Sequence, residues 1–245
     1  MEKETIEKIV ELADPYVKEI DGTSYLLHKG GDAYTEIKAT PEFPGTLALN
    51  SLDALVEMVG TEAAQKHTAP FYLMALAHNK VTCYTQPLDA LQNERAVLYT
   101  VSATDVPGWE DNTQLPFEEA LIAIRTRFQE SADTVYLLKL LSDITNGAKV
   151  TYSDNGMATT VVTQKGVALQ GSDTIKPIVK LKPYRTFMEI EQPESLFHIR
   201  VSERGIKFIE ADGGMWKLTA RRTIAGYLKE KLDAMVKSGD VIVTS

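Results

Sequence analysis

The stretch AKVTYSDNGMATTVVTQKG, residues 148–166, places Asn155-Gly156 between two runs rich in β-branched residues. Asn-Gly favours the tight turn that joins two antiparallel strands, because both of its residues tolerate a positive φ. The stretch therefore predicts a β-hairpin. Since further hairpins are predicted on both sides of it, we expect an α+β fold built mainly from antiparallel sheets.

Strand patterns extend from this hairpin in both directions. Towards the N-terminus, TSYLLHK and AYTEIKA flank the turn residues Gly30 and Gly31, and residues 70–104 predict a three-stranded meander. Towards the C-terminus, period-two alternation predicts strands over VALQG, IKPIVKLK, RTFMEIEQ, LFHIRV and IKFIEA, and a short strand over VIVTS at the end.

About five helices accompany the sheets. Apolar residues at helical spacing predict them over residues 3–13, 50–60, 115–129, 131–147 and 221–237. Asn50 or Ser51 is expected to cap the second helix, and Ser131 the fourth. The chain is expected to form a mixed α/β lobe over residues 1–145 and a β-rich lobe, closed by a helix, over residues 146–245. One continuous domain is the alternative.

The composition is that of an ordinary globular chain. Its 245 residues are 44% hydrophobic and 24% charged, which suffices for a substantial core. No apolar run is long enough to cross a bilayer, and the N-terminus lacks a signal peptide's apolar region, so we expect a cytoplasmic location and no membrane partner. The single cysteine, Cys83, excludes an internal disulfide and is expected to face inwards on a strand.

The net charge of −8 is unevenly distributed along the chain. Residues 1–175 contain 13 Lys and Arg against 25 Asp and Glu, a net −12, whereas residues 176–238 contain 13 against 8, a net +5. The acidic majority opposes non-specific nucleic-acid binding, which depends on clustered cations. The basic part can contact an anion or dock on the acidic part of another copy, and a pair of solvated surfaces is the simpler explanation.

The sequence contains none of the familiar catalytic or cofactor signatures. A GxxxxGK(S/T) phosphate loop, GxGxxG after a strand, HExxH, GxSxG and cysteine–histidine clusters are all missing, and the four histidines are separated in sequence. We therefore expect no cofactor and no metal, and the sequence favours a non-enzymatic protein without deciding the matter.

The segment KPYRTFMEIEQPESLFHIR, residues 182–200, is the richest in ionisable groups. Alternation is expected to place Glu189 and Glu191 on one strand face, with Glu210 and Asp212 from FIEADGG near by. Such carboxylates can hold Mg²⁺ or divide acid and base roles, although a solvent-facing strand surface is the simpler explanation.

Cations and aromatics form a second candidate binding face. Arg185 and Arg200, with Lys207 and Lys217, are expected on neighbouring strands as a clamp for phosphate or carboxylate groups. The interleaved aromatic residues are more typical of a core than of base stacking, and Trp216 is expected to be a packing anchor. Trp109, in the polar loop VPGWEDN, is expected to be exposed for partner binding.

The segments PIVKLKPYRTFMEIEQPESLFHIRV and FIEADGGMWKLTA, with the early helix LALNSLDALVEMV, resemble the YfdQ-like family of phage and prophage proteins. The resemblance covers most of the chain outside residues 60–145. It implies an origin among phage early genes, near recombination, single-strand-binding or host-takeover functions. It supplies no catalytic residues.

Three functions are therefore open. The first is a phage or prophage protein that binds a host or phage protein, with counter-defence and homo-oligomer formation as its variants. The second is an accessory protein of phage DNA metabolism that contacts nucleic acid, or mimics it with its acidic part. The third is a carboxylate- or metal-dependent nucleotide hydrolase, which requires Glu189, Glu191, Glu210 and Asp212 to converge in one cleft.

Overall fold

The computed structural model describes residues 16–20, 23–27, 34–37, 45–63, 70–87, 93–146, 149–154, 159–165 and 168–245. The chain divides into two compact units. The first comprises Met1–Pro44 and Pro87–Ala96, and the second comprises Gly45–Gln86 and Val97–Ser245. The predicted division at residue 145 was based on the succession of predicted helices and strands and stays a prediction. The helix predicted over residues 3–13 lies outside the described residues.

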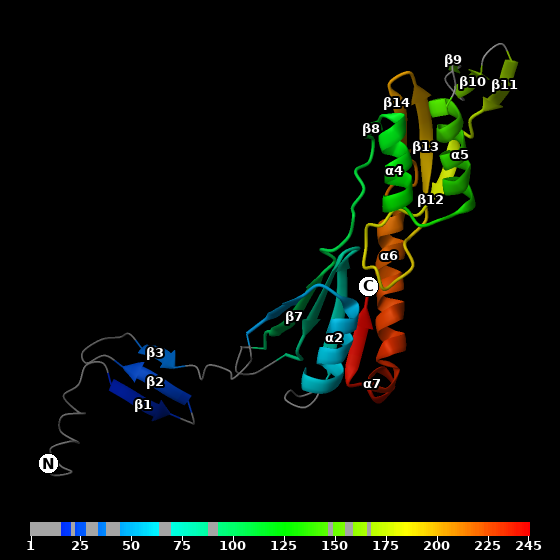
Figure 1. Cartoon of the computed structure of the whole chain (residues 1–245). Coiled ribbons are helices and arrows are strands. Elements are labelled where there is room, and N and C mark those ends of the chain that lie inside the picture. The colour runs from blue at the N-terminus through cyan, green and yellow to red at the C-terminus, as the bar shows by residue number, and fades with distance from the viewer. Residues whose placement is uncertain are drawn as a thin grey trace, which may run out of the picture. The chain divides into compact units, whose positions relative to one another are not determined.

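The described part of the first unit is a small antiparallel sheet of order β1-β2-β3 (Figure 1). Its strands are β1 (Tyr16–Ile20), β2 (Thr23–Leu27) and β3 (Tyr34–Ile37). Ser24 pairs with Ile37 and Leu27 with Tyr34, which confirms the predicted pairing of TSYLLHK with AYTEIKA.

The second unit contains a five-stranded sheet of order β15-β5-β6-β7-β4. The strands are β4 (Leu47–Leu49), β5 (Phe71–Ala77), β6 (Lys80–Tyr84), β7 (Val97–Ser102) and β15 (Val241–Thr244). The central three form the predicted antiparallel meander, with His78 in the turn between β5 and β6. The terminal strand β15 pairs in parallel with β5, and β4 pairs in parallel with β7.

Helices α2 (Leu52–Met58) and α6 (Met215–Lys231) cover one face of this sheet. Helix α2 contacts β7, α6 contacts β5 and β15, and the two helices contact each other (Figure 1). The Ser51 hydroxyl accepts a hydrogen bond from the Ala54 amide at 3.0 Å and caps α2, as predicted. The π-helical turn η1 (Val59–Ala63) continues the helix, so Gly60 does not end it. Cys83 is fully buried, which confirms its inward position.

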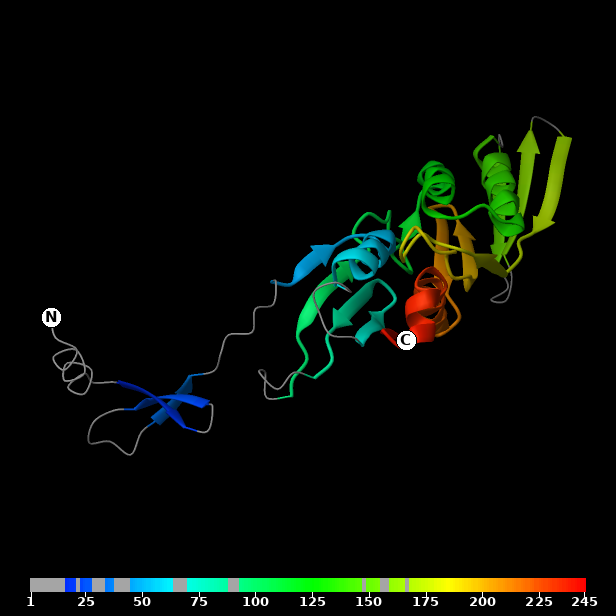
Figure 2. The ribbon, with the colours of Figure 1, turned by 90° about the horizontal axis from the view of Figure 1, so that it is seen from below.

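A second sheet in the same unit has the order β12-β13-β14-β8 and is antiparallel throughout. Its strands are β8 (Gln114–Leu115), β12 (Ile178–Leu181), β13 (Ser195–Ser202) and β14 (Gly205–Glu210). Helices α4 (Phe117–Arg127) and α5 (Ala132–Asn146) lie on one side of it, as Figure 2 shows in green. The buried residues of these helices and strands form one hydrophobic cluster.

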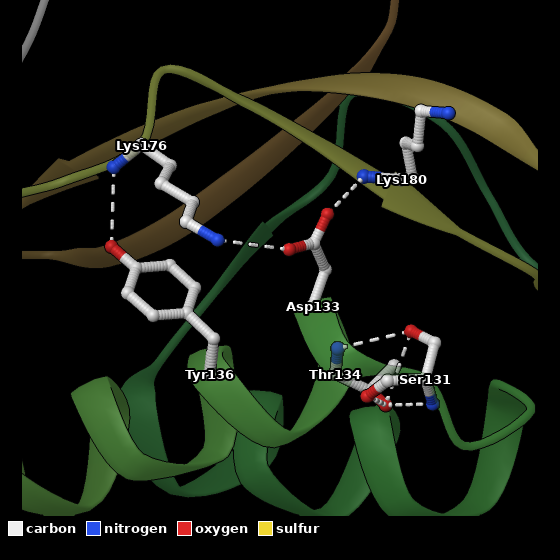
Figure 3. Close-up of polar contacts among 6 residues, drawn as sticks. All are labelled: Ser131, Asp133, Thr134, Tyr136, Lys176 and Lys180. Atoms are coloured by element: carbon white, nitrogen blue, oxygen red, sulfur yellow. Dashed lines mark hydrogen bonds and ion pairs between the residues drawn. The ribbon is translucent and has the colours of Figure 1, made fainter.

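A polar cluster holds the start of α5 against β12 (Figure 3). The Ser131 hydroxyl accepts from the Thr134 amide at 3.2 Å, the predicted cap. One oxygen of Asp133 accepts from the Lys180 amide at 2.8 Å, and the other pairs with the Lys176 ammonium at 3.2 Å. Because β12 is the edge strand, Asp133 satisfies a backbone donor that the sheet itself leaves unpaired.

The hairpin of residues 148–166 forms a third sheet of order β11-β10-β9. Its strands are β9 (Lys149–Asp154), β10 (Thr159–Lys165) and β11 (Ala168–Thr174). Asp154 pairs with Thr159 and Lys149 with Gln164, so the predicted antiparallel pairing is confirmed. Asn155 and Gly156 themselves lie outside the described residues.

Two predicted elements are wrong in the second unit. RTFMEIEQ is not a strand, because β12 pairs directly with β13 and residues 182–194 form the connection between them. The last helix begins at Met215, six residues earlier than predicted, and a short helix α7 (Asp233–Ser238) follows it. The α+β class with antiparallel and mixed sheets is confirmed. None of the described helices has the length and apolar character needed to cross a membrane.

Candidate binding site

The connection formed by residues 182–194 is organised around the buried amide of Gln192. The backbone amides of Arg185 and Thr186 both donate to its Oε1, at 3.0 and 3.2 Å. Its Nε2 donates to the Phe187 carbonyl at 2.9 Å. One side chain thus satisfies several backbone groups that would otherwise be buried without partners, so this segment folds as an ordered loop.

The guanidinium of Arg185 is the centre of the site. Its side chain is only 7% exposed, its Nη1 forms an ion pair with Glu210, and its Nη2 donates to the Ser195 hydroxyl. The guanidinium carbon lies 3.6 Å from the ring centre of Trp216, a stacking cation–π contact. Burial lowers the pKa of Arg185, and Glu210 opposes that shift by favouring the charged form.

Asp212 supports the same cluster from the turn before α6. The Ser195 hydroxyl, which accepts from Arg185, donates to Asp212 Oδ2 at 2.8 Å. The Gly214 amide donates to Asp212 Oδ1 at 3.0 Å. Gly213 and Gly214 have φ values of 63° and 79°, a conformation that glycine adopts at little cost. The glycines of FIEADGG therefore serve to direct Asp212 and Trp216 towards Arg185.

The loop also connects the four-stranded and five-stranded sheets of the second unit. The Thr186 hydroxyl donates to the carbonyl of His78 in the β5–β6 turn. Glu189 Oε1 accepts from the Leu52 amide at 2.6 Å, where it adds to the capping of α2. Arg185 binds the end of β14 through Glu210, so this short loop contacts elements of both sheets.

A cavity of about 460 Å³ lies beside Arg185. It is bordered by the β5–β6 turn, the loop before β8, the end of β14 and the start of α6. Its lining residues are His78, Asn79, Ala103, Val106, Gly108, Trp109, Asp111, Arg185, Glu210, Trp216 and Lys217. We call this cavity the Arg185 pocket.

His78 enters the Arg185 pocket as a neutral imidazole near pH 7. Burial, together with the positive charges of Lys217 and Arg185, lowers its pKa below the usual value of 6.5. Its ring meets Trp216 edge-on, with the ring centres 4.6 Å apart. The Lys217 ammonium lies 5.6 Å from the centre of the same indole and forms no ion pair within the described part of the chain.

Unpartnered donors are concentrated at this pocket. Among the described residues, three buried side-chain polar atoms have no hydrogen-bond partner: Trp109 Nε1, Arg185 Nε and Trp216 Nε1. All three belong to residues that line the Arg185 pocket. Buried donors without partners are rare in folded proteins, and their concentration here distinguishes this cavity.

The structure brings together three of the predicted site residues, Arg185, Glu210 and Asp212. Trp109 also lines the pocket, but its predicted exposure is wrong. Its ring packs edge-on against Phe128 and Phe208, with centres 4.6 and 5.3 Å apart.

The other predicted residues lie elsewhere. Glu189 is at α2, beside a smaller cavity of about 260 Å³, and Glu191 is exposed in an ion pair with Lys182. They do not share a strand face, because their segment is a loop. Arg200 lies on the outward face of β13 opposite Lys207, so those two cations are on neighbouring strands as predicted. The predicted clamp of four strand cations is nevertheless wrong, because Arg185 lies in a loop and Lys217 in α6, where both line the Arg185 pocket.

Gln192 and Ser195 are the site residues that sequence reasoning missed. Both are nearly fully buried polar side chains within the segment QPES. Nothing in the alternation pattern distinguishes a buried Gln from an exposed one. His78 lies in the β5–β6 turn, and its position beside Trp216 arises from a contact between distant segments, which no local pattern indicates.

No group of three or more His, Cys, Asp or Glu side chains within the described ranges is arranged to hold a metal ion. Comparison with known proteins gives no match to a family model, to a curated protein or to a solved structure. The functional inference therefore depends on the pocket's own residues.

Proposed function

We propose that this chain is a phage- or prophage-encoded binding protein that catalyses no reaction and attaches to a host or phage protein through the Arg185 pocket. The observation that carries the proposal is one cavity lined by two tryptophans and a nearly buried arginine. Trp and Arg are the residues that most often dominate binding energy at protein interfaces.

Contacts within the chain already hold Arg185 in place in the absence of a partner. The Arg185 side chain is held by Glu210, Ser195 and Trp216. The Arg185 backbone amide is held by a hydrogen bond to Gln192. A rigid site loses little conformational freedom when it binds, so more of the contact energy appears as affinity. Such a site is suited to recognition of one protruding group of a partner.

The hydrolase alternative receives less support from the geometry. It requires four carboxylates in one cleft, yet Glu189 caps α2 and Glu191 pairs with Lys182 at the surface. Glu210 lines the pocket and Asp212 lies beside Ser195, and both already accept hydrogen bonds from neighbouring residues. The phage origin and a counter-defence role rest on the YfdQ-like resemblance alone.

Site-specific photo-crosslinking tests the proposal. A benzoylphenylalanine replaces Asn79, which is exposed and lines the pocket, or Lys229, an exposed residue of α6 outside it. In host cells we expect one discrete protein adduct from position 79 and none from position 229. The adduct should disappear when Lys217→Glu is added, and mass spectrometry identifies the partner for reconstitution with purified protein. Equal adducts from both positions, or persistence with Lys217→Glu, would contradict the proposal.

Self-association belongs to the same proposal, because a second copy is one partner that the opposite charges of the chain allow. Light scattering of the purified chain across salt concentrations tests this variant. A mass above that of the 27.1 kDa monomer that falls as salt rises would support it, and a monomer at low salt would contradict it.

A second candidate function is contact with single-stranded DNA, favoured by the outward face of the β12–β13–β14 sheet. Arg200 and Lys207 lie directly opposite each other there, beside His198. Fluorescence anisotropy with labelled single-stranded DNA should show salt-dependent binding that Arg200→Ala/Lys207→Ala abolishes and Lys229→Ala preserves. No binding at low salt would exclude this function.

A further inference from the structure

We propose that the five-stranded sheet forms the interface of a homodimer, in which two copies of the chain pack face to face. The surface concerned is the side of the sheet that carries Met74, Leu76 and Ile242, and we call it the open face. This inference goes beyond the proposed function, because it does not involve the Arg185 pocket. It follows from the exposure, the composition and the end charges of the open face.

The open face is the side of the sheet that helices α2 and α6 leave uncovered. These helices contact β5, β7 and β15, where alternate residues such as Leu73 and Val243 are buried. The residues between them point to the opposite side of the sheet. There Met74 is 39% exposed, Leu76 45% and Ile242 39%. Large apolar side chains that stay exposed on adjacent strands are typical of an association surface.

The open face carries almost no charge. Lys80 is the only charged residue within the five strands, although 24% of the whole chain is charged. The central row of the face crosses all five strands through the uncharged residues Thr244, Met74, Thr82, Thr100 and Ala48. Charged residues are depleted at the centre of protein interfaces, and an apolar centre is most pronounced in homodimers. This composition therefore favours a face that another copy covers.

The charges at the two ends of the open face are complementary to a second copy. Lys80 pairs with Ala77 at the end of β5, whereas the Asp240 carbonyl accepts from the Phe71 amide at its beginning. Alternation with Ile242 places Asp240 on the side of the open face. Neither Lys80 nor Asp240 forms an ion pair within the described ranges.

A twofold axis that runs across the strands, between the two sheets, brings these ends together. It reverses the strand direction of the second copy, so the Lys80 end of each copy lies over the Asp240 end of the other. The arrangement thus matches opposite charges twice and leaves the uncharged row in the centre. A partner that carried one sign of charge would match only one end.

The size of the open face predicts a weak, reversible dimer. Five strands about 4.8 Å apart, each about five residues long at about 3.3 Å per residue, present about 400 Å² from each copy. Two such faces lie at the lower end of the size range of specific interfaces. Because apolar burial is not screened by ions, the dimer should persist as salt rises. This persistence distinguishes it from the charge-driven self-association considered above.

Sedimentation equilibrium of the full chain at high salt, over increasing protein concentration, tests the dimer. Met74→Glu places a charge at the centre of the open face, and Leu196→Glu is the matched control, since Leu196 is 37% exposed on β13 of the other sheet. The wild type and Leu196→Glu should approach twice the monomer mass of 27.1 kDa. Met74→Glu should weaken dimerisation about tenfold or more, because each copy would bury a carboxylate against the other.

Thr244→Glu, an exposed change in the same central row, gives a second variant, and melting curves verify that every variant is folded. A wild type that stays monomeric at every concentration would overturn the proposal, even if the open face bound a different protein. Equal dimerisation of folded Met74→Glu and Leu196→Glu would overturn it as well.

Charge reversal at low salt tests how the two copies are arranged. Lys80→Glu should weaken the dimer, because it places two carboxylates at each end of the interface. Adding Asp240→Lys to the same chain should restore most of the loss, since the opposite charges then meet again. A double variant that dimerises no better than Lys80→Glu would overturn the twofold arrangement.

Discussion

Arg185 lies across the indole of Trp216, with its guanidinium carbon 3.6 Å from the ring centre. The two residues belong to the two distinctive segments of the sequence, KPYRTFMEIEQPES and FIEADGGMW, which are separated along the chain and meet only in the fold. Both segments thus contribute to one cluster around a buried cation.

Replacing Arg185 should destabilise the second unit strongly. Arg185→Ala leaves the part-buried Glu210 carboxylate without its partner and removes the contact with Trp216. Breaking a buried ion pair costs about 3–5 kcal/mol, and we expect a loss near the lower end because Glu210 is 19% exposed. Urea denaturation measures the change. Arg204→Ala, at an exposed turn position, is the control and should change the free energy of unfolding by less than about 0.5 kcal/mol.

Acidification should destabilise the protein through His78. The folded-state pKa of His78 is lowered below 6.5, so the unfolded chain takes up a proton at a higher pH than the folded chain does. Above about pH 6.5 His78 is neutral in both states and does not lower the free energy of unfolding. As the pH falls below that value, protonation favours the unfolded chain and the free energy of unfolding decreases. Urea titrations between pH 5 and 8 should show a weaker pH dependence for His78→Gln than for the wild type. The same pH dependence of the free energy of unfolding in both proteins would contradict the lowered pKa of His78.

A methyl group at Gly205 should separate β8 from β14. Gly205 has a φ of 121°, and a Cβ there would lie 2.0 Å from the Leu115 carbonyl oxygen, a backbone atom that cannot move freely. Gly205→Ala should therefore lower the melting temperature markedly. Gly226→Ala is the matched control, because Gly226 lies in α6 with open space around it and should gain up to about 1 kcal/mol. Equal melting temperatures for the two variants would contradict the register of β8.

Cys83 should be unreactive while the protein is folded. Burial raises its thiol pKa to about 12, so almost no thiolate forms at pH 8. Ellman's reagent should label no thiol of the native chain and one thiol in urea. Rapid labelling of the native protein would show that the five-stranded sheet does not enclose this residue.

Two side chains share the capping of α2, and the loss of either should destabilise the helix. Ser51→Ala removes the bond from the Ala54 amide and should cost about 1 kcal/mol. Glu189→Gln keeps an acceptor for the Leu52 amide but removes the charge, so it should cost less than Glu189→Ala. Urea denaturation of the three variants tests this order. A larger loss for the Gln variant than for the Ala variant would contradict the capping role of Glu189.

Local signals predicted much of the fold. The pairing of β9 with β10, the meander of β5, β6 and β7, and the helix caps Ser51 and Ser131 depend on period-two alternation and capping, which act over a few residues. The segment RTFMEIEQ was mispredicted for the same reason. It alternates like a strand, but a strand needs a partner, and β12 and β13 already pair with each other.

The candidate site was predicted in part. Arg185, Glu210 and Asp212 were selected because they are charged residues in distinctive segments, and they do lie together. Trp109 was selected because polar residues surround it in sequence, yet its ring packs on Phe128. Sequence neighbours do not reveal which side of a loop faces the core.

The sequence by itself determined the α+β class, the hairpins, most of the helix boundaries and the inward position of Cys83, since these follow from interactions among near neighbours. Only the tertiary structure decided that residues 182–194 are a connecting loop whose backbone is hydrogen-bonded by the buried amide of Gln192. It also decided that one pocket is bordered by His78, Arg185, Trp216 and Lys217. Those features arise from contacts between residues far apart in the chain, and the burial and charge that give the pocket its properties exist only once the sheets and helices are packed together.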